Sequence, residues 1–248
     1  MVKVQREIPI WGTIIYIECD GANQGQLEAG IDKCTEFFGE VDEIFSTYKE
    51  GSQVSKLRRA EIKIGDCHPD LQLVWQECLL AKELTEGSFD PWAVEGGFDP
   101  SGYVKGWASD RAVEILKEHG AVFVQVNAAG DLSLLGGPHR IGIRSPDDGN
   151  VILKIFESAG GAIATSGTYE QGAHIRDPHT SLIAIGARSA TVIGPDGGLA
   201  DALATALVVS GRDGAHWFDT KALAEYSAWV IDRHDATAWS IGYGHDRD

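Results

Sequence analysis

The sequence GGLADALATALVVSG, residues 197–211, decides how we read the rest of the chain. Alanine and leucine dominate it, a glycine pair precedes it and Gly211 follows it, so the stretch predicts a helix capped by glycine. Asp201 and Thr205 are four residues apart and therefore share one helix face. A carboxylate and a hydroxyl are hard oxygen ligands of the kind that Mg²⁺ accepts. In the alternative reading Asp201 faces the helix dipole and Thr205 bonds back to a carbonyl oxygen.

The composition is that of a globular protein. The chain has 248 residues, of which 43% are hydrophobic and 23% charged, enough to bury a sizeable core. The 37 acidic and 21 basic residues give a formal net charge of −16, which argues against a nucleic-acid partner or an anionic membrane surface. An anionic ligand would therefore need a local cation, either a lysine or a metal ion.

Targeting and redox signals are sparse. No apolar run approaches the length of a membrane span, and residues 1–20 show no signal peptide. We therefore expect a cytoplasmic protein without an integral membrane segment, or an extracytoplasmic one if a leader was removed. The four cysteines lack C-x-x-C spacing, so buried free thiols are expected ahead of disulfides or zinc.

Periodicity predicts helices and strands in irregular alternation. The expected helices are residues 27–45, 68–84, 108–118, 197–211 and 218–224, and the expected strands are 8–18, 121–126, 151–156, 189–194, 227–232 and 237–241, with a hairpin-like run at 139–144. No linker or repeat is visible, so residues 1–248 are expected to form one domain. The irregular order favours an α+β fold, with mixed or antiparallel sheets and flanking helices, over a doubly wound sheet.

The densest polar stretch lies between residues 87 and 110. Two F-D-P turns, at residues 89–91 and 98–100, flank only six residues, so both can face one cleft. Lys105 stands between Gly102 and Gly106, which let a ligand come close, and it supplies a local cation. The alternative is a pair of Asx-type turns that lead into a helix with Asp110 in its first turn.

Two further segments offer polar groups. Thr165, Ser166 and Gly167 follow an apolar strand and can form a ligand wall, although Thr-Ser-Gly is also ordinary turn chemistry. His174 precedes a D-P turn near that wall and is a candidate proton acceptor. The alternative for His174 is a structural role, which is the more frequent one for a lone histidine. His179, in the same segment, is read as a surface residue.

Taken in order, these stretches resemble the FAD:protein FMN transferases, the ApbE-type flavin transferase family. The matching motifs are W-G-T at 11–13, S-T-Y…S-x-V-S at 46–55, G-S-F-D-P at 87–91, D-P-S-G-Y-V-K-G-W-A-S-D at 99–110, N-A-A-G-D at 127–131, A-T-S-G-T-Y-E at 164–170, H-I-x-D-P at 174–178 and A-D-A-L-A-T-A-L at 200–207. They cover residues 10 to 211. The resemblance implies a single α+β domain that binds FAD and Mg²⁺.

The resemblance also assigns roles to individual residues. The implied FAD contacts are Trp11, Tyr48, Ser88, Phe89, Asp90, Asp99, Lys105, Thr165, Ser166 and Gly167. The implied metal ligands are the side chains of Asp201 and Thr205 and the carbonyl of Gly102, and His174 resembles the general base. The chain departs from the family pattern in several places: Trp11 replaces a methionine, Ser88 replaces an alanine and Ser181 replaces a glycine. The insertion usual between Asp90 and Asp99 is nearly absent.

The implied reaction is Mg²⁺-dependent transfer of FMN from FAD to a threonine or serine hydroxyl of an acceptor protein, with release of AMP. Mg²⁺ and Lys105 would screen the pyrophosphate, and His174 would take the proton of the hydroxyl. Two other functions remain open on the same site. One is hydrolysis of FAD to FMN and AMP, and the other is FAD binding without turnover.

Overall fold

The computed structural model describes residues 1–167 and 175–242, and within them one antiparallel sheet carries the fold. The strands follow one another in chain order, so each pairs with the next. They are β1 (Val2–Ile10), β2 (Thr13–Gly21), β3 (Ala121–Ala128), β4 (Asp131–Arg144), β5 (Ile152–Gly167), β6 (Ala187–Gly194), β7 (Ser227–Asp232) and β8 (Ala238–Gly242). The α+β class expected from the sequence is confirmed, with an antiparallel sheet.

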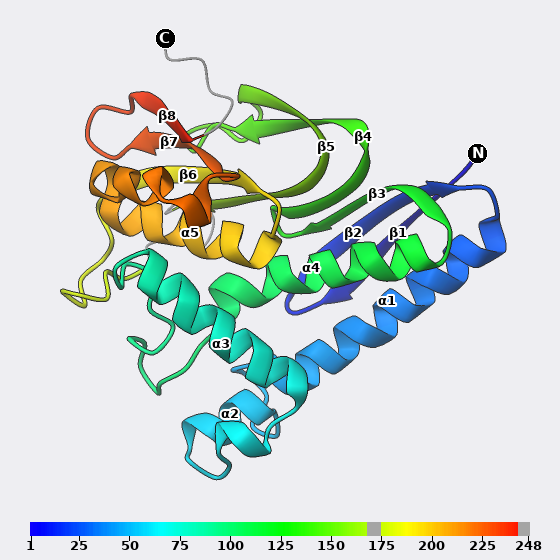
Figure 1. Cartoon of the computed structure of the whole chain (residues 1–248), viewed down its shortest axis with the longest axis horizontal. Helices are drawn as coiled ribbons and strands as arrows, with labels where there is room; N and C mark the ends of the chain where they lie inside the picture. Colours follow the sequence, from blue (N-terminus) through cyan, green and yellow to red (C-terminus); the bar gives the residue numbers. More distant parts are fainter. Residues whose placement is uncertain (168–174, 243–248) are drawn as a thin grey trace.

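The helices enter this meander at two places (Figure 1). Between β2 and β3 the chain forms α1 (Gln24–Phe45), α2 (Gln53–Arg58), α3 (Pro69–Leu84) and α4 (Ser101–Glu118). Between β6 and β7 it forms α5 (Gly197–Ser210), followed by short 3-10 helices at Gly211–Asp219 and Lys221–Leu223. None of the helices in the described ranges is long and apolar enough to cross a membrane.

The main core lies between the sheet and the helices α1, α4 and α5. Phe38 of α1, Leu116 of α4 and Leu203 of α5 are fully buried in it. A smaller apolar cluster, which includes Ile163 and Trp229, lies on the strands β4 to β7. Because neighbouring residues of a strand point to opposite faces, β5 and β6 contribute to both clusters.

Several predicted elements agree closely with the structure. The expected helix 197–211 is α5, where Asp196 caps the first turn by accepting a hydrogen bond from the Leu199 N–H at 2.7 Å and Gly211 ends the helix with φ 56°. All four cysteines are free and buried, as expected, and burial raises the pKa of the Cys19 thiol to about 11. The outermost predicted strands, 227–232 and 237–241, correspond to β7 and β8.

Other elements had to be corrected. The single strand expected at 8–18 is a hairpin, because Trp11 and Gly12 take positive φ values of 57° and 72° and form a two-residue turn between β1 and β2. The strand expected at 151–156 continues to Gly167 through Gly161, and the run 139–144 is the second half of β4. Instead of a helix at 218–224, the chain forms 3-10 turns.

The correction that matters most for function concerns α4. It begins at Ser101 rather than at residue 108. The carboxylate of Asp99, just before the helix, accepts a hydrogen bond from the Ser101 N–H at 3.0 Å. Lys105 therefore lies on a helix and not in a loop, and Asp110 lies in the middle of that helix instead of its first turn.

Candidate functional site

The site is built where α4 and α5 approach each other. A Cβ on Gly106 would lie 2.0 Å from the carbonyl oxygen of Gly197, and a Cβ on Gly198 would lie 2.5 Å from the Tyr103 ring. The two backbones are thus in direct contact, which only glycine permits. This contact sets Lys105 of α4 opposite Asp201, one turn into α5.

Lys105 joins three elements through ion pairs. Its Nζ lies 2.9 Å from Oδ2 of Asp201, and it also pairs with Oδ2 of Asp131, the first residue of β4. Both carboxylate side chains are 4% exposed, whereas the lysine side chain is 31% exposed. Burial by itself lowers the pKa of Lys105, but the charges of Asp131 and Asp201 outweigh it and raise that pKa. The lysine is therefore held by the protein's own carboxylates, as an ammonium ion.

Thr205 brings a group of hydroxyls beside Asp201. Its Oγ1 lies 3.0 Å from Oγ of Ser166 on β5. A Cβ on Gly102 would lie 3.6 Å from the same Thr205 oxygen and 3.2 Å from the Phe89 ring. Four parts of the chain therefore meet here: α4, α5, β5 and the turn before α4. They contribute Gly102, Asp201 and Thr205, Ser166, and Phe89, respectively.

Thr165 lies apart from this group. Its Oγ1 is 2.9 Å from Oγ1 of Thr191 on β6. Thr191 pairs in turn with Trp229 of β7, which belongs to the smaller apolar cluster. Because Thr165 and Ser166 are successive residues of β5, their side chains point to opposite faces of the sheet. Only Ser166 of this pair lies against α5, and Gly167 ends the strand.

Asp110 stabilises the same helix contact. Its carboxylate accepts hydrogen bonds from the Gly197 N–H at 2.6 Å and from the Ser133 hydroxyl at 2.5 Å. Burial raises the pKa of Asp110 to about 6, although both hydrogen bonds act in the opposite direction. Asp110 thus ties the first turn of α5 to α4 and β4.

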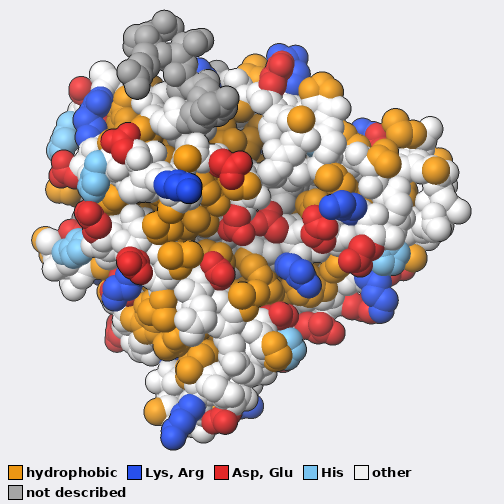
Figure 2. All heavy atoms as spheres, in the orientation of Figure 1, with side chains coloured by type: hydrophobic (Ala, Val, Ile, Leu, Met, Phe, Trp, Pro, Cys, Tyr) orange, Lys and Arg blue, Asp and Glu red, His pale blue; other side chains and the backbone are white. Residues whose placement is uncertain are grey.

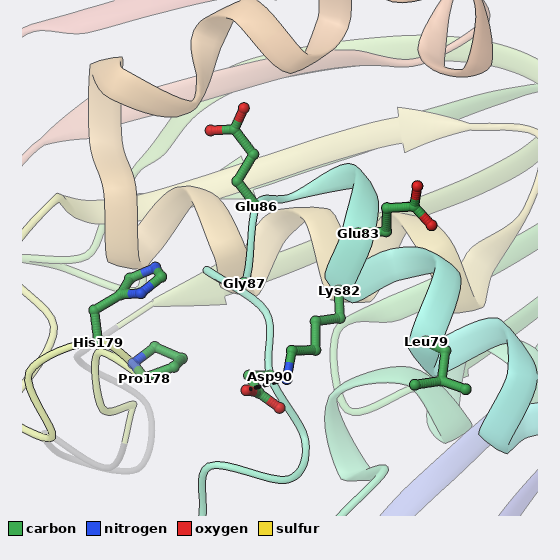
Figure 3. Close-up of a pocket in the computed structure, with 8 residues that line it drawn as sticks. All are labelled: Leu79, Lys82, Glu83, Glu86, Gly87, Asp90, Pro178 and His179. Carbon is green, nitrogen blue, oxygen red and sulfur yellow. Dashed lines mark ion pairs between the residues drawn. The ribbon is translucent and has the colours of Figure 1, made fainter.

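The Ser88-Phe89-Asp90 turn leads from α3 towards the site. Ser88 Oγ is 2.7 Å from Oγ of Ser210 at the end of α5, and Phe89 is buried. Asp90 points outward, where it pairs with Lys82 of α3 at 2.7 Å and accepts a hydrogen bond from the Trp92 N–H. An open hollow of about 520 Å³ lies beside Asp90, between the end of α3 and Pro178–His179 (Figure 3). Its volume suits a small ligand.

Trp11 and Tyr48 lie on other elements. The Trp11 indole donates a hydrogen bond to the backbone carbonyl of Phe38 on α1 at 3.2 Å, and it packs edge-on against the Phe38 ring. Tyr48 is 97% exposed in the segment between α1 and α2. His174 lies outside the described residues.

The chemistry of the donor groups fits a hard divalent cation. A buried carboxylate, Asp201, stands one helical turn from the Thr205 hydroxyl, and Gly102 lets the α4 backbone come near. Across residues 1–167 and 175–242 no group of three or more histidine, cysteine, aspartate or glutamate side chains is arranged to hold a metal. Any metal there would depend on hydroxyl and carbonyl oxygens as well as on the carboxylate. Acidic and apolar side chains meet near the middle of the face in Figure 2.

Comparison with known proteins identifies the family. The ApbE family model matches residues 11–95 and 93–228. The chain belongs to the ApbE family. A protein of Rhodobacter capsulatus named FAD:protein FMN transferase is 35% identical over 127 residues. That match covers 46% of this chain, and it spans about a quarter of the relative's length, 24%.

Solved structures of the family share the fold. The flavin transferase ApbE of Vibrio cholerae has a TM-score of 0.81 at 23% identity, and the ApbE protein of Thermotoga maritima has 0.84 at 22%. Each comparison covers 97% of both chains. The flavinyl transferase ApbE of Pseudomonas stutzeri has a TM-score of 0.80 at 20% identity, covering 97% of this chain and 94% of its own.

The structure adds two residues that the sequence reading did not single out. In the sequence, Asp131 is only the last residue of N-A-A-G-D, and Asp110 is the last residue of D-P-S-G-Y-V-K-G-W-A-S-D and part of an expected helix turn. Their places in these motifs are the available signal, and they identify no partner for either carboxylate. Both partners become visible only when β4 is placed against α4.

Proposed function

We propose that this protein is a flavin transferase that moves FMN from FAD to a serine or threonine hydroxyl of an acceptor protein and releases AMP. Membership of the ApbE family and the name of the Rhodobacter capsulatus relative support a transferase. The observation that carries the proposal is the Lys105–Asp201–Thr205 arrangement, which gathers a cation, a buried carboxylate and a hydroxyl at one helix crossing.

The proposed roles follow from these side chains. A Mg²⁺ ion held by Asp201, Thr205 and the Gly102 carbonyl would screen the pyrophosphate and the charge that develops on departing AMP. Lys105 would donate to a pyrophosphate oxygen, because its ammonium is charged and its side chain is partly exposed. The Ser88–Asp90 turn and Tyr48 would contact the flavin nucleotide.

The proposed transfer balances as a phosphoryl substitution. The acceptor oxygen forms a bond to the FMN-side phosphorus while His174 takes its proton. The bond from that phosphorus to the bridging oxygen breaks, and the electron pair leaves with AMP. A base is needed because a serine or threonine hydroxyl is almost wholly protonated at neutral pH, and such a base commonly contributes about 10²–10⁴ in rate.

The test is incubation of the protein with FAD, Mg²⁺ and a peptide that carries a flavinylation site. Flavin fluorescence on the peptide together with an equal amount of AMP supports the proposal. AMP and FMN without labelled peptide indicate a FAD pyrophosphatase, in which water replaces the acceptor hydroxyl. Saturable FAD binding without either product indicates a binding protein. His174→Ala should lower transfer at least a hundredfold while FAD affinity holds.

A further inference from the structure

The roles proposed above leave Asp131 unexplained. It is a nearly buried carboxylate at the first position of β4, and it forms one of the two ion pairs that Lys105 makes within the described residues. The turn before it is fixed, since the Asn127 side chain accepts a hydrogen bond from the Gly130 N–H at 2.9 Å. Asp131 therefore reaches Lys105 from a hydrogen-bonded turn at the start of β4.

The buried carboxylate of Asp201 requires a positively charged partner. Two carboxylates and one ammonium give the Lys105–Asp131–Asp201 cluster a net charge of −1. Asp201 is so deeply buried that it needs a positive partner, and Lys105 supplies it in this structure. Oδ2 of Asp201, the oxygen that contacts the lysine, is then already used.

From this geometry we infer a cation exchange: Lys105 neutralises Asp201 until a divalent cation binds there, and Asp131 then retains the lysine. The inference rests on the proposed function, because the cation at Asp201 is the one proposed for transfer. It makes Asp131 a positioning residue, which acts through Lys105 and not on the flavin nucleotide.

Two physical arguments favour exchange over sharing. An ammonium and a divalent cation on one buried carboxylate repel each other strongly where the dielectric constant is low. Lys105 can avoid this repulsion without losing its charge partner, since it already contacts Asp131 and its flexible side chain is 31% exposed. A lysine with only one carboxylate partner has no such alternative.

Exchange also reverses the charge of the cluster. Addition of a divalent cation changes −1 to +1, because the two carboxylates and the ammonium all remain. An empty site therefore repels a pyrophosphate, and a loaded one attracts it. The N–H group of Lys105 that is released from Asp201 can then donate a hydrogen bond to a phosphate oxygen.

A charge-matched pair of variants tests the exchange without FAD. In Lys105→Met/Asp131→Asn the cluster keeps its net charge of −1, with Asp201 alone, but the competing ammonium is gone. Mn²⁺ titrated by calorimetry should bind this double variant at least tenfold more tightly than the wild type. In Asp131→Asn the lysine has Asp201 as its remaining cluster partner, and Mn²⁺ should bind at least tenfold more weakly.

A remote variant controls for charge alone. Lys117, also on α4, is 54% exposed and pairs with Glu114, so Lys117→Met removes one positive charge away from the site. Its Mn²⁺ affinity should stay within about twofold of wild type, because exposed charges at a distance are screened by salt. Circular dichroism and the metal-induced rise in melting temperature show which variants are folded.

The outcomes are separable. Mn²⁺ affinity of the double variant within threefold of wild type overturns the exchange, since the lysine would then not compete. If the double variant does not fold, unchanged or tighter Mn²⁺ binding by Asp131→Asn overturns it instead. The flavin transfer assay on the wild type is read separately: transfer without the affinity pattern refutes the exchange only, and the pattern without transfer refutes the proposed function only.

Discussion

Replacement of Gly106 by alanine tests the helix contact on which the site depends. In an unobstructed helix interior, glycine to alanine stabilises by about 0.5–1 kcal/mol. At Gly106 the added methyl would lie 2.0 Å from the oxygen and 2.3 Å from the carbon of the Gly197 carbonyl. Ordinary contact needs about 3.5 Å, so backbone must move by on the order of 1.5 Å. Such overpacking costs about 1–3 kcal/mol or more.

Gly39 provides the matched comparison. It lies inside α1, and a Cβ there would have nothing within 4 Å. We expect the free energy of unfolding of Gly106→Ala to be about 3 kcal/mol lower than that of Gly39→Ala. Urea denaturation followed by circular dichroism measures both. Mn²⁺ binding should weaken in Gly106→Ala alone, because separation of the helices moves the Gly102 carbonyl of α4 away from Asp201 and Thr205 of α5, the other proposed ligands. Equal unfolding free energies for the two variants would refute the reasoning.

Three further predictions concern single side chains. As the pH rises from about 4 to about 7, the unfolding free energy of the wild type should fall by up to about 3 kcal/mol relative to that of Asp110→Asn. The reason is that the pKa of the Asp110 carboxyl is raised from 3.8 to about 6 by folding, so in this pH range the folded protein binds more protons than the unfolded chain. Parallel curves for the two proteins across that pH series would contradict this. Asp201→Asn should weaken Mn²⁺ binding more than tenfold by calorimetry, since a neutral amide replaces the one carboxylate proposed as a metal ligand, and full metal affinity in the variant would remove Asp201 from the site. Tyr48→Ala should weaken FAD binding about tenfold in a fluorescence titration and leave the unfolding free energy unchanged, because the ring is 97% exposed and free to contact a flat ligand; an unchanged FAD affinity would exclude that role.

Elements with local signals were predictable from the sequence. The apolar spacing and the Gly211 cap predicted α5, and the same kind of spacing predicted α1 and α3. Asp201 and Thr205 were placed on one helix face by their spacing alone. These features depend on residues within a few turns of each other, so no tertiary information is needed.

The errors arose where tertiary contacts override local preference. Gly102 and Gly106 lower helix propensity and predicted a loop. In the structure Gly102 forms a non-helical kink in the first turn of α4, and Gly106 is helical because the backbone of α5 packs against it. Trp11 is an unusual residue for a tight turn, so the β1–β2 hairpin was missed. The Asp131–Lys105 pair depends on the register of β4 beside α4, which no local pattern encodes.

The insertion of α1 to α4 between β2 and β3 has a kinetic consequence. Each of the other strand pairs in the described ranges joins neighbours separated by a turn or a shorter segment, but β2 and β3 are separated by residues 22–120. Closing so long a loop must precede their pairing, which slows it relative to local hairpins. During refolding, pulse-labelled amides of the β2–β3 ladder should gain protection after those of β4 and β5, and simultaneous protection would contradict this. By the same reasoning, Lys105 should meet Asp131, 26 residues away, before it meets Asp201, 96 residues away.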